Sequence, residues 1–249
     1  MNHPQLSVQL YTVREAMQDD LPGTLARIAE IGFDQVEPYN FPAFPDLGAA
    51  LKAASLTAPT THAHLVGASD EELATLFAAA KSLGIARVID PHVPAERWQS
   101  VESVAEIAAQ LNAAAVIAAQ HGVTIGYHNH AHELESILDG RTALEVLTDS
   151  LSPDVKLEVD TYWVQVGGQN PVDLLRTLGD RVVALHIKDG AGTPEPKDQT
   201  AVGSGTLPIR NIVEAAPDAL RVVELDDSRG DRFQAIADSF AYLTKENLA

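Results

Sequence analysis

Residues 181–189 read RVVALHIKD, an apolar run that ends in His186, Lys188 and Asp189. A short continuous run of Val, Ala, Leu and Ile is typical of a strand that is buried on both faces, as the strands of parallel sheets are. Similar runs recur along the whole chain. We therefore predict strands at 6–11, 35–38, 58–62, 87–90, 124–129, 156–160, 182–187 and 221–225.

Amphipathic segments separate these runs, and their ends carry the usual helix signals. Ser69 precedes Asp70, Glu71 and Glu72, which indicates a capped helix start with acidic residues in the first turn. Pro171 suits the first turn of another helix. The glycines that follow helical segments fit left-handed C-caps, and these are Gly32, Gly84, Gly122 and Gly179. We predict helices at 21–31, 44–55, 70–83, 100–121, 140–150, 171–178, 207–215 and 232–244.

Alternating strands and helices of this number define the expected fold. Eight strand–helix units of about 30 residues predict an α/β protein with a single (β/α)8 TIM barrel domain over residues 1–249. An open doubly wound sheet is disfavoured, because residues 10–14 (LYTVR) lack the glycine-rich phosphate turn that follows the first strand of such folds. The stretch 189–206 is expected to be a loop without regular structure, and its length indicates a functional role.

Composition narrows the class of partner. The 17 Lys and Arg residues against 35 Asp and Glu residues give a formal net charge of −18, which argues against nucleic acid as a partner. No apolar run approaches the ~20 residues needed to cross a bilayer, and residues 1–13 lack a secretory signal pattern. We therefore expect a cytoplasmic protein without a membrane partner. The absence of cysteine excludes disulfides and Cys-ligated zinc. A small molecule is the expected partner, and homo-oligomer formation stays open.

Active sites of TIM barrels form at the C-terminal ends of the strands and in the loops that follow them. These positions collect carboxylates, imidazoles and a few other polar groups: Tyr11, Arg14, Glu37, His62, His64, Asp90, His92, His128, Asn129, His130, Glu133, Glu158, Asp160, His186, Lys188, Glu224 and Asp226. Six of the nine histidines are in this set. A divalent metal held by carboxylate and imidazole groups is the simplest explanation for such a rim.

Six motifs carry a resemblance to a known family. In chain order they read LSVQLYTVRE, GFDQVEPYN, GYHNHAHELE, LEVDTYWVQVGG, RVVALHIKD and VVELDD. Together they resemble the sugar phosphate isomerase/epimerase family, which has the xylose isomerase-like TIM barrel. The resemblance implies a divalent cofactor, with Mn²⁺ first and Mg²⁺, Co²⁺ or Zn²⁺ as alternatives. It also implies three metal ligands, namely Asp160, His186 and Glu224.

The fourth ligand departs from the family pattern. Family members resemble one another in a glutamate at the end of the fifth strand, and this sequence has His128 there. Either His128 is the ligand or Glu133, five residues later, supplies the carboxylate. The charge preferred by Mn²⁺ or Mg²⁺ favours Glu133, whereas the position in the motif favours His128. A second imidazole would move the metal preference toward zinc, cobalt or iron.

The resemblance implies chemistry through an enediolate, which needs a base and an acid. Glu224 matches one catalytic acid/base of related epimerases, and the other is expected to be Glu133, His128 or Lys188. A nearby divalent cation would lower the pKa of Lys188 and make it a general base near neutral pH. The alternative for Lys188 is an ion pair with Asp160, Glu158 or Asp189.

Further rim residues are expected to bind the substrate. His62 matches a family position that contacts substrate hydroxyl groups, and the other members of this set are Tyr11, Arg14, Glu37, His130 and Trp163. Trp163 could equally be ordinary packing under a loop. Glu158, two residues before Asp160, either orients a metal ligand or pairs with an interior Lys or Arg.

Two other functions compete with the isomerase or epimerase. The same enediolate can expel a β-substituent, which would make the protein a lyase or dehydratase on an inosose or a 3-keto-glycoside. A non-catalytic sugar-binding barrel is the second alternative. No motif indicates a phosphate group on the sugar substrate, and the sequence does not name the sugar.

Overall fold

The predicted strands form one parallel sheet in a computed structural model that describes residues 6–249. Residues 1–5 of the predicted domain, and of the segment tested for a signal sequence, lie outside the described residues. The sheet has eight strands in the order β2-β1-β12-β9-β8-β5-β4-β3. The strands are β1 (Leu6–Gln9), β2 (Gln35–Glu37), β3 (Thr60–His62), β4 (Arg87–Asp90), β5 (Thr124–His128), β8 (Val155–Asp160), β9 (Val182–Ile187) and β12 (Leu220–Val223). Two parallel bridges, Gln35–Thr57 and Tyr39–His62, join β2 to the β3 side and close the barrel.

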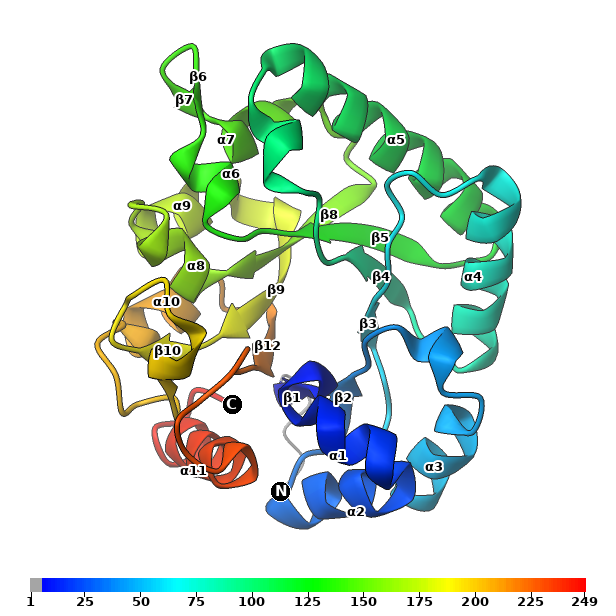
Figure 1. The fold of residues 1–249 in the computed structure, drawn as a ribbon, viewed down its shortest axis with the longest axis vertical. Helices are drawn as coiled ribbons and strands as arrows, with labels where there is room; N and C mark the ends of the chain where they lie inside the picture. The colour runs from blue at the N-terminus through cyan, green and yellow to red at the C-terminus, as the bar shows by residue number, and fades with distance from the viewer. Residues whose placement is uncertain (1–5) are drawn as a thin grey trace.

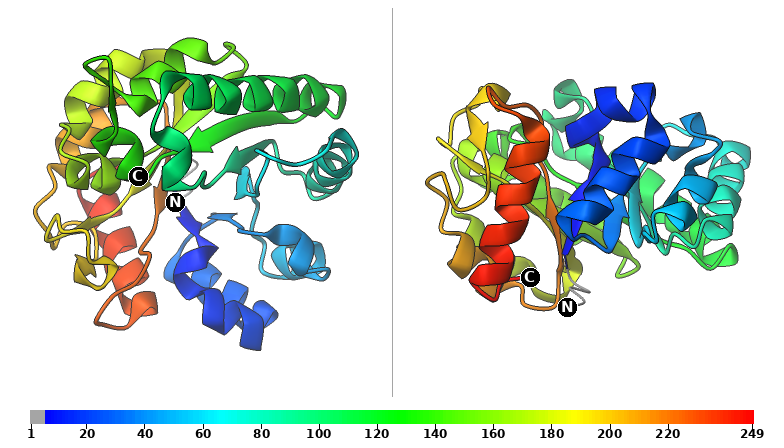
Figure 2. Two further views of the ribbon diagram at one scale, coloured as in Figure 1. Left: turned by 45° about the horizontal axis from the view of Figure 1, so that its top comes forward. Right: turned by 90° about the horizontal axis from the view of Figure 1, so that it is seen from below.

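The helices surround this barrel (Figure 1). They are α1 (Arg14–Asp19), α2 (Leu21–Ile31), α3 (Leu47–Ala53), α4 (Asp70–Ser82), α5 (Val101–Gln120), α6 (His132–Glu135), α7 (Ala143–Ser150), α8 (Thr161–Val166), α9 (Pro171–Leu178), α10 (Ile209–Ala215) and α11 (Arg232–Lys245). Figure 2 shows the last helix, α11, beside the first helices of the chain. The rings of Phe33 and Phe240 meet there, with centroids 4.9 Å apart. The fold class predicted from the sequence is confirmed.

The local helix signals are confirmed as well. The side chain of Ser69 accepts a hydrogen bond from the backbone N–H of Glu72, and the Glu72 carboxylate accepts one from the backbone N–H of Ser69. Pro171 is the first residue of α9. The backbone φ is positive at each glycine expected to end a helix, namely Gly32, Gly84, Gly122 and Gly179. Glycine adopts this conformation without the clash that a Cβ atom would cause.

Several predicted bounds differ from those of the structure, and three departures from the prediction have a clear local cause. The first strand ends at Gln9, because the Gln9 side chain accepts a hydrogen bond from the backbone N–H of Tyr11 and starts a 3-10 turn, η1 (Leu10–Val13). The helix expected at 140–150 begins at Ala143, because a hairpin precedes it, formed by β6 (Ile137–Leu138) and β7 (Arg141–Thr142). The stretch 189–206 contains a second hairpin, of β10 (Asp189–Gly190) and β11 (Gln199–Thr200).

Helix α5 is the longest helix of the outer layer. By length and composition it is the one helix among residues 6–249 that could cross a membrane. It packs against α4, α7 and β5, however, and buries seven residues of its inner face. Its apolar character is therefore explained by its place between two helices and the barrel wall.

The interior of the barrel is polar at its C-terminal end. Apolar side chains fill the space between strands and helices, as the buried residues Ile28, Phe77 and Leu147 illustrate. Inside the barrel, in contrast, carboxylates and imidazoles are fully or almost fully buried. Burying charged groups costs free energy unless they are paired, so this end of the barrel is built for a purpose other than packing.

Candidate active site

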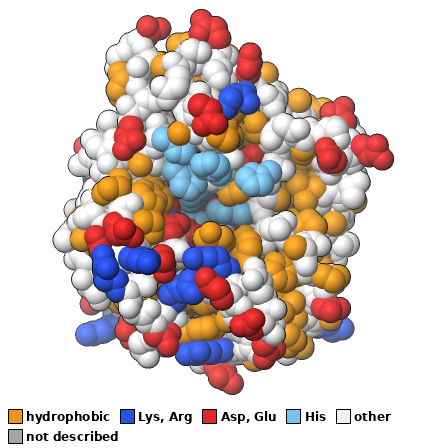
Figure 3. Space-filling view, in the orientation of Figure 1, with side chains coloured by type: hydrophobic (Ala, Val, Ile, Leu, Met, Phe, Trp, Pro, Cys, Tyr) orange, Lys and Arg blue, Asp and Glu red, His pale blue; other side chains and the backbone are white. Residues whose placement is uncertain are grey.

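A cavity of about 930 Å³ opens at the C-terminal end of the barrel. Figure 3 shows histidine side chains gathered in the hollow at the centre of this face. Seven of the residues given a role from the sequence line the cavity: Tyr11, Arg14, His62, His128, His130, Trp163 and Glu224. His64, His92 and Asp226 of the predicted rim line it as well. The cavity lies where active sites of TIM barrels form, and its volume is in the range of small-molecule sites.

Beside this cavity, the ends of three neighbouring strands bring Asp160, His186 and Glu224 together. One ligand atom from each lies within 4.8 Å of the others. Nδ1 of His186 is 2.6 Å from Oε2 of Glu224. Oδ1 of Asp160 accepts hydrogen bonds from the backbone N–H groups of Tyr162 and Trp163 at the start of α8. Those bonds fix the carboxylate and leave Oδ2 directed at the group. We call these three residues the outer group.

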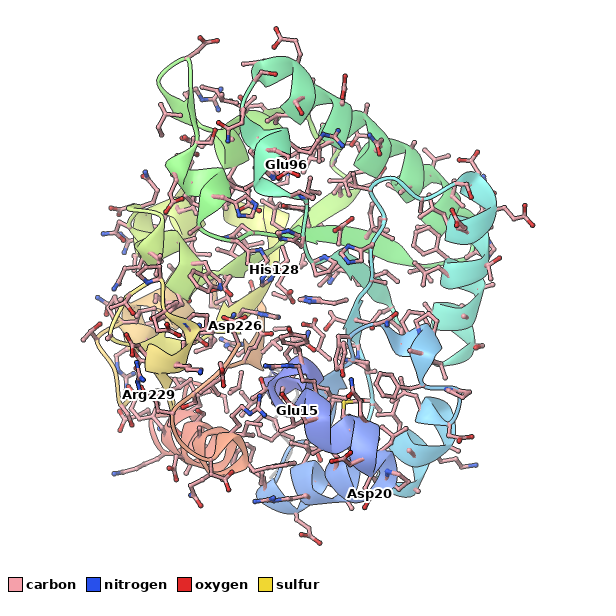
Figure 4. The ribbon with its side chains drawn as sticks, in the orientation of Figure 1. Glu15, Asp20, Glu96, His128, Asp226 and Arg229 are labelled. Atoms are coloured by element: carbon pink, nitrogen blue, oxygen red, sulfur yellow. The ribbon has the colours of Figure 1, made fainter. Side chains whose placement is uncertain are left out.

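The ammonium group of Lys188 contacts three carboxylates at this point. Its Nζ lies 2.9 Å from Asp160, 2.8 Å from Glu224 and 2.7 Å from Asp226. Asp226 also accepts hydrogen bonds from Trp163 Nε1 and Gln199 Nε2. Figure 4 labels Asp226 and His128, which both lie toward the centre of the barrel mouth. Asp226 was expected on the rim without a role, and Gln199 was not expected at the site.

A second set of side chains lies next to the outer group. It shares His186 with the outer group and adds His62, His128 and Glu158. All four residues are buried, and their ligand atoms lie within 4.8 Å of one another. Oε2 of Glu158 is 2.6 Å from His62 Nε2, 3.0 Å from His128 Nδ1 and 3.0 Å from His186 Nε2. Three imidazole nitrogens therefore converge on a single carboxylate oxygen. We call these four residues the inner group.

His186 of the outer group and His128 beside it each direct one ring nitrogen toward the carboxylates of the outer group and the other nitrogen away from them. His186 turns Nδ1 to Glu224 and Nε2 to Glu37, whose Oε1 is 2.8 Å away. Gln9 holds Glu37 in place by donating a hydrogen bond of 2.8 Å to the same oxygen. His128 turns Nδ1 to Glu158, while its Nε2 lies 3.7 Å from Asp160 Oδ2. Glu37, expected to bind substrate, is thus placed behind His186.

Burial and neighbouring charges shift the pKa values of the outer group. Burial raises the pKa of Asp160 to about 6, although Lys188 opposes the shift. Burial alone would raise the pKa of Glu224, but Lys188 and His186 hold that pKa well below its usual range. Burial would lower the pKa of Lys188, but Asp160, Asp226 and Glu224 hold it well above its usual value. Lys188 is therefore an ammonium group in this network, which agrees with the expected ion pair to Asp160.

The inner group carries both charged and neutral members. Burial would raise the pKa of Glu158, but His186 and His62 hold that pKa well below its usual range. Burial, with His186 adding to it, lowers the pKa of His128 to about 3. Burial also raises the pKa of Glu37, and Glu158 adds to that shift. An ionised Glu158 facing a neutral His128 ring is the arrangement that follows.

Glu133 lies apart from both groups. Its Oε1 accepts a 2.6 Å hydrogen bond from Tyr127 Oη, and its Oε2 accepts one of 2.9 Å from the backbone N–H of His130. Tyr127 neighbours His128 on β5, so the two side chains point to opposite faces of the strand. Since Glu133 is bonded to the side chain that points away from the barrel axis, its carboxylate is directed away from the outer group. Burial raises the pKa of Glu133 to about 7.

The remaining expected substrate contacts lie around the cavity mouth. The Arg14 guanidinium sits 4.3 Å from the centre of the Tyr11 ring and donates hydrogen bonds to the backbone carbonyls of Tyr11 and Asp226. Trp163 lies beside His130, with ring centroids 6.3 Å apart. His130 Nδ1 is buried and accepts or donates no hydrogen bond within residues 6–249. These groups form the side walls above the two buried groups.

The family model named xylose isomerase-like TIM barrel matches residues 25–245, which is most of the chain. The chain belongs to this family. No curated protein matches the sequence, so the further comparisons are with solved structures.

Three solved structures illustrate what this xylose isomerase-like barrel is similar to. A sugar phosphate isomerase/epimerase from Parabacteroides distasonis is 22% identical, with a TM-score of 0.83, and covers 99% of this chain and 96% of its own. A probable 3-DHS dehydratase from Bacillus anthracis is 16% identical, with a TM-score of 0.74, over 98% and 99% of the two chains. The IOLI protein with a bound zinc atom is 17% identical, with a TM-score of 0.70, over 98% and 97%. At these identities the likeness shows the fold.

The donor set of the outer group suits a divalent cation. Two carboxylates and an imidazole are ligands that Mn²⁺, Zn²⁺ and related ions accept. Lys188 Nζ lies 2.9 Å from Asp160 Oδ2 and 2.8 Å from Glu224 Oε2, so the ammonium group and the two carboxylates meet at one point. A buried cluster of carboxylates around one point needs a positive charge, which Lys188 and His186 supply here and which a divalent ion could supply as well.

Proposed function

We propose that this xylose isomerase-like barrel is a divalent-metal-dependent isomerase or epimerase that acts on a ketose or keto-sugar through an enediolate. The observation that carries the proposal is the convergence of Asp160, His186 and Glu224 beside a cavity of about 930 Å³. A cation bound by these residues would supply a Lewis acid for two vicinal oxygens of a hydroxy-ketone. The same rim residues would then bind the sugar.

We place His128 rather than Glu133 in the fourth ligand position. His128 Nε2 faces Asp160, whereas both oxygens of Glu133 accept hydrogen bonds elsewhere. Mn²⁺ remains the first choice because two carboxylates are present, with Mg²⁺ and Co²⁺ as alternatives. The second imidazole makes Zn²⁺ a stronger rival than the sequence alone suggested. The zinc atom in the IOLI structure likewise favours Zn²⁺ as the rival.

Proton transfer is assigned to Glu224 and Lys188. Glu224 lines the cavity as an ionised carboxylate, so its oxygen can take the α-proton of a bound keto-sugar. Lys188 Nζ, 2.8 Å from Glu224, carries the proton that is needed when the enediolate is protonated again. This assignment makes Lys188 the acid of the pair, because the surrounding carboxylates keep it protonated.

The walls of the cavity favour a sugar without a phosphate group. Arg14 is the one Lys or Arg side chain that lines it, and its guanidinium already binds two backbone carbonyls. Four carboxylates line the same cavity, from Glu195, Glu224, Asp226 and Asp227. A phosphate group would find no unpaired Lys or Arg side chain among the lining residues of the described chain, so we propose an uncharged keto-sugar as the substrate.

Solvent exchange tests this function. The enzyme with Mn²⁺ is incubated in D₂O with ketoses, inososes and 3-keto-glycosides, and the products are examined by mass spectrometry and NMR. We expect carbon-bound deuterium in a product of unchanged formula, and no exchange with Asp160→Asn protein. Release of water or an aglycone would instead establish a lyase. Tight sugar binding with neither result across the panel would contradict catalysis and favour the sugar-binding alternative.

One observation favours the lyase as the second candidate. Related epimerases are expected to use two carboxylates, and in the fifth-strand motif of this sequence His128 replaces one of them. A protonated Lys188 beside Glu224 suits the departure of a β-hydroxyl group as water or of a glycosidic oxygen as an alcohol. The structural neighbour named as a probable dehydratase has the same fold.

A further inference from the structure

Glu158 takes no part in the chemistry proposed above. It is 1% exposed, far from solvent for a carboxylate, and it lies on β8 directly opposite His128 of β5 in the barrel register. One of its oxygens, Oε2, meets imidazole nitrogens from three strands, and the other, Oε1, has no hydrogen-bond partner within residues 6–249. Burying a carboxylate costs free energy, so its presence here calls for an explanation in function or specificity.

The contact between Glu158 and His128 fixes which nitrogen of the ring faces the outer group. Because an ionised carboxylate only accepts hydrogen bonds, Oε2 of Glu158 at 3.0 Å favours the tautomer that carries the proton on Nδ1. Nε2 then carries the lone pair, and it is the nitrogen that points to Asp160. Metal-binding histidines commonly donate their second N–H to a carboxylate, which orients the ring and makes it a stronger ligand.

The same arrangement occurs at His186, the neighbouring ligand. There Nδ1 faces Glu224, and Nε2 lies 2.8 Å from Glu37 Oε1. Two imidazoles thus each have a buried carboxylate behind them, on the side away from the outer group. Glu158 Oε2 also lies 3.0 Å from His186 Nε2, so Glu158 contacts both rings. The arrangement is hard to attribute to packing alone, because it buries two carboxylates, Glu37 and Glu158, behind the two rings.

We propose that Glu158 is a positioning residue for a metal held by the outer group: it locks His128 with Nε2 toward the cation and supplies, from behind the ring, the negative charge that a fifth-strand carboxylate would have provided. This inference rests on the metal site of the proposed function. It explains how His128 can stand where a carboxylate is expected without loss of the site's charge, since the charge has moved from β5 to the facing position on β8.

Metal binding in two backgrounds tests the proposal. Mn²⁺ and Co²⁺ affinities and stoichiometries are measured by equilibrium dialysis for the wild type, Glu158→Gln, His128→Glu and the double variant. We expect Glu158→Gln to weaken binding about 10- to 100-fold while one ion per chain still binds. In the His128→Glu background the same change should be neutral or favourable, because two facing carboxylates repel each other. A purely structural Glu158 would cost the same in both backgrounds.

The matched control is Glu133→Gln, which neutralises another buried carboxylate on this rim. It should bind Mn²⁺ as the wild type does, and circular dichroism checks that each variant is folded. Nitrogen-15 NMR of labelled histidine adds a readout independent of affinity: His128 should carry its proton on Nδ1 in the wild type and lose that preference in Glu158→Gln.

Three results would overturn the inference. They are unchanged affinity in Glu158→Gln, an equal loss in both backgrounds, and two bound ions per wild-type chain of which Glu158→Gln removes one. The last result would make the inner group a metal site in its own right. A wild type that binds no divalent cation would overturn the proposed function together with the inference, whereas a wild type that binds metal with an insensitive Glu158→Gln overturns the inference alone.

Discussion

Nζ of Lys188 lies 2.9 Å from Oδ2 of Asp160, so a buried ammonium group already contacts the carboxylate that we assign to a divalent cation. The lysine and the cation must share this oxygen or compete for it. Because like charges repel, the lysine weakens metal binding while it keeps the carboxylates neutralised. This relationship gives Lys188 an effect on metal affinity, on stability and on turnover, and each can be measured.

Replacing Lys188 by Met separates these effects. The variant should bind Mn²⁺ several-fold more tightly, since the competing charge is gone, and should lose turnover because the acid is missing. Without metal, its free energy of unfolding should fall by about 3–5 kcal/mol, the cost typical of a buried charge without its partner, and Mn²⁺ should restore part of it. Calorimetric titration and urea unfolding, each with and without EDTA, check these outcomes. Loss of metal in the variant would show that Lys188 supports the site instead.

The pH–rate profile of the wild type should show no rising limb from deprotonation of Lys188 near neutral pH. The surrounding carboxylates hold the pKa of this lysine well above its usual value, so it stays protonated through the working range. The general-base role expected from the sequence would require the opposite shift. A rising limb between about pH 6 and 9 that is absent from Lys188→Met would restore that role.

The buried carboxyl group of Glu133 should make the free energy of unfolding depend on pH. Its pKa is about 7 in the folded protein, against 4.5 for an ordinary glutamate. The folded state therefore holds a proton that the unfolded state has lost between these values, and the free energy of unfolding falls as pH rises from 4.5 to 7. Glu133→Gln should remove this fall and gain about 2–3 kcal/mol on the wild type between pH 4.5 and 8. A difference that does not change with pH would contradict the buried carboxyl group.

Most of the fold was predictable because periodicity and caps are local properties. The strand-like runs and the glycines after helices place all eight barrel strands, and β4, β9, α2 and α9 match their predicted bounds. The hairpin of β6 and β7 was missed although Asp139 and Gly140 form the kind of two-residue turn that hairpins favour. Two residues per strand are too few for alternation to show.

The site was predictable up to the point where contacts between strands decide. Asp160, His186 and Glu224 could be grouped because strand ends meet at one rim. The sequence could not choose between His128 and Glu133, since the choice depends on how residues 129–133 turn after β5. The facing of His128 and Glu158 depends on the register of β5 and β8, and the contact of Gln199 with Asp226 depends on where the β11 hairpin folds back.

Metal content is the most direct test of the proposal that Asp160, His186 and Glu224 bind a divalent cation. Wild-type protein, Asp160→Ala and Glu224→Ala are loaded with Mn²⁺, desalted and analysed for metal, with circular dichroism to confirm folding and Glu133→Gln as the control. We predict about one ion per chain in the wild type and the control, and no stoichiometric metal in either alanine variant. Unchanged metal content in both alanine variants would contradict it.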